Sequence, residues 1–305
     1  MKREERDTIL VPTDFTDVSE FALDHAIEIA RIFKHKICLL HVISKKTTGT
    51  GKLLIMQENM ENHVAAIQKR TGLKVSYMIV EGSIFTTISE VADRIFAEFI
   101  VMGIHGKKGV QHLLGSYAYK VVSSSKIPVL VVKHMHQHVG YKNIVLPVDF
   151  SKKRAHKIAE AIRFGKYFGA TIRIFGFLSS HNKARIIKKE ALLKGVNDMF
   201  SKQNIPVTTD LLVNPGSDWA EALMKYADNV NADLVMMVAE KSGRMTDVLY
   251  SNFTERIIDK ADLPVLTVAP IKEFDEDEVQ KKAFLKPFID PLGLLSEPEP
   301  PGLGK

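Results

Sequence analysis

The chain has 305 residues, of which 45% are hydrophobic and 26% are charged, and its formal net charge is +6. This composition is typical of a globular protein, and the length is sufficient for two domains of about 150 residues each. The basic residues are scattered and are not interleaved with aromatic side chains, so we interpret the positive charge as favouring solubility or attracting a small anion, and do not expect nucleic acid as the ligand.

No apolar run in the sequence is long enough to cross a bilayer, and the first residues lack the long apolar segment of a signal peptide. We therefore expect a cytoplasmic protein that does not associate with membranes. The single cysteine, Cys38, lies inside the apolar run ICLL. We expect it to be a small buried core residue.

Taken in chain order, the first half alternates short apolar runs with stretches of helical periodicity. The pattern predicts strands over residues 9–12, 36–42, 74–80, 99–102 and 129–132, and helices over residues 18–34, 52–71, 85–97 and 116–124. Such alternation indicates an α/β fold, in which parallel strands are joined by right-handed crossovers and covered by helices on both faces.

The second half of the sequence repeats the first. TILVPTDFT, which begins at Thr8, is echoed by NIVLPVDFS from Asn143, and KIPVLVV from Lys126 is echoed by DLPVLTV from Asp262. The first pair is offset by 135 residues and the second by 136, which is a domain-sized period. We predict two tandem doubly wound domains, each with a mainly parallel five-stranded sheet flanked by helices.

These domains are expected over residues 1–138 and 139–270, and residues 271–305 form a C-terminal tail. The tail combines an acidic stretch at 273–278, proline-rich residues at 298–301 and an apolar stretch at 283–289. We expect it to be partly disordered or docked on the body of the protein.

A doubly wound sheet binds ligands beyond the carboxyl ends of its strands, where the strand order reverses. The fourth strand leads into GIHGKKGVQHLLGS, which runs from Gly103 to Ser116. Glycines let a backbone approach a ligand closely, and the N-terminus of a helix attracts an anion. This loop favours phosphate binding, and Lys107 and Lys108 add positive charge. The alternative is a glycine-rich turn in which Ser116 caps the helix.

Four motifs in order resemble the universal stress protein (UspA) family: the opening ILVPTDFT, the strand end LHVI from Leu40, the glycine loop and the closing PVLVV from Pro128. The resemblance covers residues 7–133 strongly and residues 141–270 more weakly. The duplication resembles the tandem members of the family. The resemblance implies an adenine-nucleotide-binding α/β fold, with ATP or AMP as the cofactor and Mg²⁺ as an optional companion of ATP.

Residue by residue, the resemblance implies a nucleotide site made of Pro12, Thr13, Asp14, Val42, Met102, Gly103, Gly106, Gly115 and Ser116. The first four lie on the adenosine side, and the glycines and serine cradle the phosphates. The ATP-binding branch of the family has nine residues between its Gly-x-x-Gly and its Gly-Ser. Here that spacer, residues 107–114, has eight.

In the second half, Val238, Lys241, Ser251 and Asn252 stand opposite Gly103, Gly106, Gly115 and Ser116. We interpret this half as a degenerate copy that does not bind nucleotide. Domains of this family pair through their last strands, so residues 129–132 and 265–268 are expected to pair within the chain. The sequence also leaves open whether two chains form a homodimer.

The expected function is that of a stress-response factor whose bound nucleotide changes regulation or partner choice. The sequence contains no G-x-S-x-G, H-E-x-x-H or C-x-x-C motif, so it indicates at most slow ATP hydrolysis. Two alternatives remain. One is a nucleotide-free protein-interaction scaffold of the same fold, and the other is an ATP-consuming enzyme such as a phosphotransferase.

Two further patterns are interpreted as unrelated to function. Residues 49–52, GTGK, lack the first glycine and the final serine or threonine of a P-loop, so we expect a flexible loop. His134, His136 and His138 alternate, but a metal site needs further ligands. His41 and His105 lie beside the predicted nucleotide site and are expected to be solvated or to cap the backbone.

Overall fold

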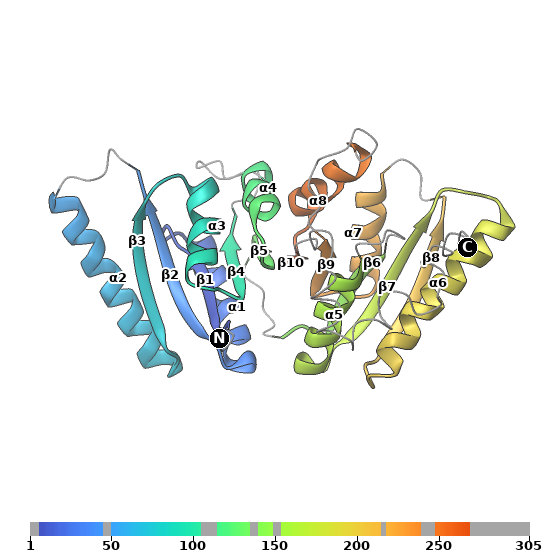
Figure 1. Cartoon of the computed structure of the whole chain (residues 1–305), viewed down its shortest axis with the longest axis horizontal. Coiled ribbons are helices and arrows are strands. Elements are labelled where there is room, and N and C mark those ends of the chain that lie inside the picture. The colour runs from blue at the N-terminus through green and yellow to red at the C-terminus, as the bar shows by residue number, and fades with distance from the viewer. Residues whose placement is uncertain are drawn as a thin grey trace, which may run out of the picture.

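The computed structural model describes residues 6–44, 50–104, 115–134, 140–148, 154–214, 218–238 and 248–268, and there the strands and helices alternate as predicted (Figure 1). The strands are β1 (Thr8–Pro12), β2 (Lys36–Ile43), β3 (Val75–Glu81), β4 (Phe99–Gly103), β5 (Val129–Val132), β6 (Asn143–Val148), β7 (Thr171–Leu178), β8 (Val207–Val213), β9 (Leu234–Val238) and β10 (Val265–Val268). The helices are α1 (Asp17–Phe33), α2 (Thr50–Thr71), α3 (Ile84–Arg94), α4 (Gly115–Ser124), α5 (Arg154–Phe168), α6 (Lys183–Ser201), α7 (Trp219–Asn229) and α8 (Val248–Lys260).

The two predicted five-stranded sheets are joined into one ten-stranded sheet, in the order β3-β2-β1-β4-β5-β10-β9-β6-β7-β8. Every neighbouring pair is parallel except β5 and β10, which pair antiparallel at the centre. Leu130 lies opposite Leu266, and the Thr267 hydroxyl donates a hydrogen bond of 3.0 Å to the Val129 carbonyl. The prediction that the two domains pair through their last strands is confirmed.

Helices cover both faces of the sheet. On one face α4 lies beside α8, and on the other α1 lies beside α5 (Figure 1). Each face has its own hydrophobic core, and each core draws residues from both halves of the chain. Because the central strands are buried on both sides, they are apolar almost throughout, as the runs VLVV of β5 and LVMMV of β9 show.

The structure corrects two predictions of local structure. α2 begins at Thr50, so Gly51 and Lys52 are helical and do not belong to a flexible loop. A glycine in the first turn costs the helix little, since the strong helix formers that follow propagate it. α3 ends at Arg94, before the predicted position 97, because Phe96 adopts a left-handed conformation with φ 51°. Gly49, His136 and His138 lie outside the described residues.

The structure describes the single cysteine and one of the three alternating histidines. Cys38 is buried, as predicted. Nε2 of His134 lies 3.5 Å from Oδ1 of Asp262, and both side chains are exposed. Among the described residues, no three His, Cys, Asp or Glu side chains are grouped to hold a metal ion. Within the same part of the chain, no helix is long and apolar enough to span a membrane.

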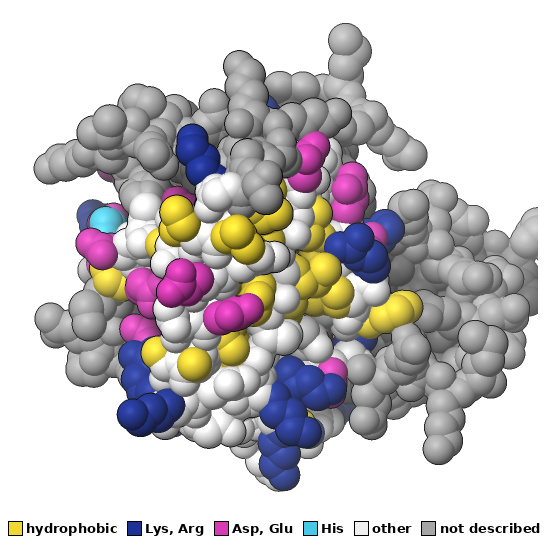
Figure 2. All heavy atoms as spheres, turned by 90° about the vertical axis from the view of Figure 1, so that its left-hand side faces the viewer, with side chains coloured by type: hydrophobic (Ala, Val, Ile, Leu, Met, Phe, Trp, Pro, Cys, Tyr) yellow, Lys and Arg dark blue, Asp and Glu magenta, His cyan; other side chains and the backbone are white. Residues whose placement is uncertain are grey.

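The end of the molecule formed by α2 and the edge strand β3 exposes apolar side chains between separate groups of acidic and basic ones (Figure 2). On α2, Leu54 and Ile55 are 62% and 61% exposed. On β3, the side chains from Tyr77 to Val80 are only partly buried. This end therefore offers an apolar surface to a partner.

The connection between the two halves is held by polar contacts inside the core. Tyr141 is buried, and a hydrogen bond of 2.8 Å joins its hydroxyl to Nδ1 of His25 in α1. Its ring packs against Phe164 and Phe168 of α5. After Tyr141, the backbone N–H groups of Lys142 and Asn143 donate hydrogen bonds to the carboxylate of Asp233. The connection is therefore fixed to both halves.

Replacing Tyr141 with phenylalanine is expected to lower the free energy of unfolding by about 1–2 kcal/mol, because the ring packing remains while a buried hydrogen bond is lost. Urea denaturation measures this loss. Tyr167→Phe is the matched control, because that side chain is 56% exposed; it should change stability by less than about 0.5 kcal/mol. Equal effects of the two changes would contradict the role given to the buried hydroxyl.

Candidate functional site

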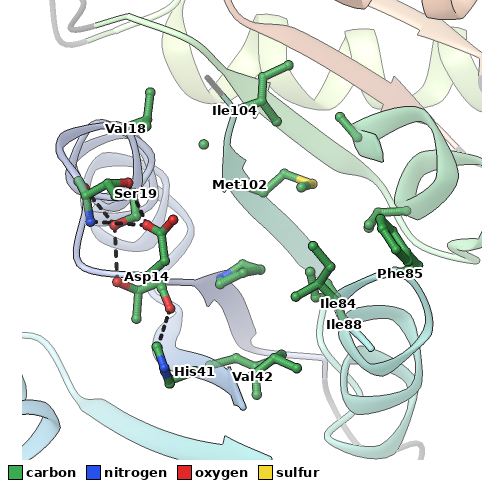
Figure 3. Close-up of a pocket in the computed structure, with 17 residues that line it drawn as sticks. Asp14, Val18, Ser19, His41, Val42, Ile84, Phe85, Ile88, Met102 and Ile104 are labelled. Carbon is green, nitrogen blue, oxygen red and sulfur yellow. Dashed lines mark hydrogen bonds between the residues drawn. The ribbon is translucent and has the colours of Figure 1, made fainter. Parts of the chain in front are cut away.

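A pocket lies at the carboxyl ends of β1, β2 and β4, where the strand order of the first half reverses (Figure 3). This is the position at which doubly wound sheets bind ligands. The pocket is lined by Pro12, Thr13, Asp14, Thr16, Val18, Ser19, Leu40, His41, Val42, Ile84, Phe85, Ile88, Met102, Gly103, Ile104, Ala118 and Val121. These residues come from three strand ends and from α1, α3 and α4.

The structure brings together six of the nine predicted site residues. Those that line the pocket are Pro12, Thr13, Asp14, Val42, Met102 and Gly103. Gly115 and Ser116 begin α4, the helix that contributes Ala118 and Val121 to the pocket wall. Gly106, Lys107, Lys108 and His105 lie outside the described residues. The roles of all nine stay predictions.

Backbone and side-chain hydrogen bonds fix the turn after β1. The backbone N–H of Thr13 donates to the Leu40 carbonyl at 2.9 Å, and the Phe15 N–H donates to the Thr13 hydroxyl at 3.2 Å. Oδ1 of Asp14 accepts from the Thr16 N–H at 3.1 Å and from the Thr16 hydroxyl at 2.6 Å. These contacts hold the carboxylate at the pocket, and its second oxygen has no hydrogen-bond partner among the described residues.

Phe15 adopts a left-handed backbone conformation, with φ 63°, in this same turn. Such a conformation is uncommon for a bulky residue and is maintained only where the surroundings impose it. Its ring, which is 38% exposed, lies 5.3 Å from His41 and 6.0 Å from His63 of α2. The turn is therefore held in one shape from both sides.

His41 lines the pocket, whereas the sequence indicated only that it lies beside the predicted nucleotide site. Its Nδ1 lies 2.8 Å from the Thr13 carbonyl oxygen. Because a carbonyl can only accept, Nδ1 carries the proton and the ring fixes the backbone of the turn. The expectation that His41 caps the backbone is thus met, and the residue also lines the pocket.

The wall opposite Asp14 is apolar, and the sequence did not predict it. Figure 3 shows Ile84, Phe85 and Ile88 of α3 facing Asp14 and Ser19 across the pocket. The only available signal was that α3 follows the end of β3, since the crossover places the start of that helix at the carboxyl edge of the sheet. A pocket with one apolar wall and one polar wall can accept a flat ring that carries hydrogen-bond donors.

Positive charge is scarce in this part of the pocket. None of the described lining residues is lysine or arginine. The ammonium group of Lys120 lies 4.8 Å from the centre of the Phe85 ring, at the α3 wall. The described part of the pocket therefore suits an uncharged or hydrogen-bond-donating portion of a ligand, with an anionic portion directed toward the start of α4.

Gly103 is required by packing within the protein. A Cβ atom at this position would lie 2.1 Å from the carbonyl oxygen of Val18 and 2.5 Å from its carbonyl carbon. The missing side chain therefore lets α1 approach the end of β4. Close approach of a helix is thus one reason for this glycine, and its predicted role beside a ligand stays a prediction, since Gly103 also lines the pocket.

The corresponding place in the second half is occupied by aromatic side chains. Counting 135 residues on, Phe177 stands for Val42 and Trp219 for Ile84. The rings of Phe177 and Trp219 stack with centroids 5.6 Å apart and an angle of 9° between them. Lys157, the counterpart of Ala22, is buried and donates a hydrogen bond of 2.5 Å to the Pro147 carbonyl. At these three positions the second half thus carries larger side chains than the first.

Comparison with known proteins agrees with this architecture. The model of the universal stress protein family matches residues 5–133 and 140–269. The chain belongs to the universal stress protein family. Universal stress protein MJ0531 of Methanocaldococcus jannaschii is 35% identical over 137 residues, which cover 41% of this chain and 81% of that protein. The resemblance seen in the sequence is therefore confirmed.

Solved structures support the fold of the whole tandem chain. The crystal structure of a universal stress protein from Archaeoglobus fulgidus covers 88% of this chain and 98% of its own, with a TM-score of 0.70 at 21% identity. A structure of the universal stress protein from Archaeoglobus fulgidus is a complex with dAMP. That complex covers 42% of this chain and 98% of its own, at 19% identity and a TM-score of 0.35, so its ligand is a property of that protein.

Gly103→Ala is expected to lower the free energy of unfolding by roughly 1–3 kcal/mol, because the added methyl group overlaps the backbone of α1. Gly195→Ala in α6 is the matched control, since nothing lies within 4 Å of its added Cβ. That change should raise stability by about 0.5–1 kcal/mol through helix propensity. Thermal and urea unfolding measure both. A Gly103→Ala protein as stable as the wild type would show that α1 does not depend on this glycine.

Proposed function

We propose that this protein is a cytoplasmic stress-response factor whose first half binds one adenine nucleotide, ATP or AMP. The observation that supports this most strongly is the pocket at the reversal of strand order, which gathers Pro12, Thr13, Asp14, Val42 and Met102 beside an apolar wall. The adenine ring would lie between Val42 and the α3 wall. The site binds an organic ring there by burying apolar surface.

The carboxylate of Asp14 limits how the nucleotide lies. It repels phosphate, and its second oxygen can accept a hydrogen bond from a ribose hydroxyl or from the amino group of adenine. The nucleoside therefore lies toward β1 and β2, and the phosphates lie toward the start of α4. There we propose that Gly106, Gly115 and Ser116 hold the phosphates through backbone N–H groups and the serine hydroxyl, with Mg²⁺ accompanying ATP.

We propose that the second half binds no nucleotide. The stacked rings of Phe177 and Trp219 occupy the place of Val42 and Ile84, and Val238 replaces Gly103. A bound adenine would have to displace these stacked, partly buried rings, and their packing stabilises the fold. The second half thus serves as the structural or regulatory partner of the first.

Binding of nucleotide to the first half can affect the second half through α4. This helix begins at the proposed phosphate site, supplies Ala118 and Val121 to the pocket, and lies beside α8 (Figure 1). A shift of α4 on binding would change its packing against α8. The proposed role is regulation or choice of partner, with at most slow hydrolysis of ATP.

The double change Val42→Phe, Ile84→Trp copies the filled second half into the first. We expect it to weaken binding of ATP and AMP by at least about 100-fold, because the rings would occupy the base position. Isothermal titration calorimetry, with and without Mg²⁺, measures the affinity. The circular dichroism spectrum and unfolding midpoint show that the variant folds.

The reciprocal change, Phe177→Val with Trp219→Ile, is the matched control. It alters the same two positions in the second half and should leave the affinity of the first half within about twofold. Unaltered binding by the folded Val42→Phe, Ile84→Trp variant would exclude this pocket as the nucleotide site. Absence of binding by the wild type at millimolar ATP would exclude the proposed function.

The second candidate function is a nucleotide-free protein-interaction scaffold. The exposed apolar side chains of Leu54 and Ile55 on α2 favour it, because contiguous exposed apolar surface marks interaction sites. This function would require no ligand in the pocket. The calorimetric titration of the wild type separates the two candidates directly.

A further inference from the structure

The surface through which the two halves meet carries a charge pattern that differs on its two sides. On the face covered by α1 and α5, where Glu160 of α5 also lies 3.4 Å from Arg163, each half has a charged helix residue and an acidic residue just before a strand at counterpart positions. In the first half these are Glu28 and Glu98, and in the second half Arg163 and Asp233. Glu28 and Arg163 are counterparts 135 residues apart, and so are Glu98 and Asp233.

On one side of the interface the charges are opposite. The guanidinium of Arg163 forms an ion pair with Glu98, which also pairs with His35. The two side chains of the pair are only 28% and 17% exposed. The guanidinium also lies 4.8 Å from the Phe33 ring centre and 4.9 Å from that of Phe99. Partial burial makes this pair stronger than one on the surface.

The chemical state of Glu98 agrees with this geometry. Burial alone would raise the pKa of the Glu98 carboxyl, but the hydrogen bond from His35 and the charge of Arg163 hold that pKa below its ordinary value. Glu98 is therefore ionised at neutral pH. It pairs with Arg163 of the facing helix as well as with His35 of its own half.

On the other side of the interface the charges are alike. Burial raises the pKa of Glu28 and the charge of Asp233 adds to the rise, while the hydrogen bond from Gly140 and the charges of Lys142 and Arg31 oppose it. Here the connection between the halves supplies the missing donors. Gly140 donates a backbone hydrogen bond to Glu28, and Asp233 accepts the N–H groups of Lys142 and Asn143. The connection therefore compensates the like-charged pair through the Gly140 N–H group and the charge of Lys142.

We propose that this asymmetry makes the first half select a second half as its partner and reject another copy of itself. If two first halves met through β5, Glu98 of each would face Glu28 of the other. Two partly buried like-charged contacts would form, without Arg163 and without the N–H groups of the connection. Repulsion of this kind discriminates between partners that share one fold.

The selected partner is the second half of a chain, and the identity of Arg163 decides the selection. The β5 edges of two identical first halves would otherwise be equally able to pair, because β5 and β10 are both short apolar strands, VLVV and VLTV. The charges therefore supply the specificity that the strands lack. The consequence is an assembly with one open pocket and one filled counterpart.

Arg163→Glu tests the proposal in the full chain, because it gives α5 the side chain that its counterpart has in the first half. We expect the pairing of the halves to loosen, seen as two unfolding transitions in place of one, a larger Stokes radius, or association between chains. Adding Glu98→Arg to this variant should restore the single transition and the wild-type radius. Analytical ultracentrifugation and differential scanning calorimetry measure these properties.

Lys166→Glu is the matched control, since it makes the same charge change one turn along α5, on an exposed side chain bonded to Gln203. It should leave the radius and the single transition unchanged. An Arg163→Glu protein that behaves like the control, or that Glu98→Arg fails to rescue, would overturn the proposal. If Arg163→Glu does not fold, Glu98→Gln and Arg163→Gln replace it: non-additive shifts in the urea midpoint support the proposal, and additive shifts overturn it.

Discussion

The antiparallel pairing of β5 with β10 is the interaction on which the rest of the structure depends. It covers two short apolar strands that would otherwise be sheet edges, and an exposed apolar edge invites association with other chains. It also brings α4 beside α8 and α1 beside α5, so that each face of the sheet has a core shared by both halves. The buried connection at Tyr141 and the ion pair of Glu98 with Arg163 exist only because this pairing places them together.

The two halves share one fold but differ at the place where a ligand would bind. Val42 and Ile84 leave a pocket open in the first half, while Phe177 and Trp219 stack at the same place in the second. The exchange of aliphatic for larger aromatic side chains adds a stacked pair of partly buried rings at this place. The second half keeps the strands, the crossovers and the β10 junction, which are what the first half needs from a partner. The second half can therefore serve as a scaffold while the pocket of the first half remains open.

The fold could be predicted from the sequence because strand and helix periodicities, the repeat of TILVPTDFT at NIVLPVDFS and the crossover rules all lead to one topology. The same rules pointed to the ends of the first and fourth strands, and the family resemblance supplied the individual pocket residues, Val42 among them. The wall formed by Ile84, Phe85 and Ile88 was not, because periodicity marks a buried helix face without showing what that face meets. The contact of Glu98 with Arg163 spans 65 residues and two domains, so no local pattern reveals it. For Gly103 the pattern gave no sign of its contact with Val18, which by itself requires the missing side chain.

Native mass spectrometry of the intact chain, titrated with ATP, tests this division of roles most directly, because it counts bound nucleotides on each molecule. A single bound nucleotide per chain at saturation is the result expected from one open pocket and one filled counterpart. Two bound nucleotides per chain would contradict the division, since the second half would then bind despite the stacked rings of Phe177 and Trp219. No bound nucleotide at all would contradict the assignment of the first-half pocket and leave the interaction scaffold as the function of this fold.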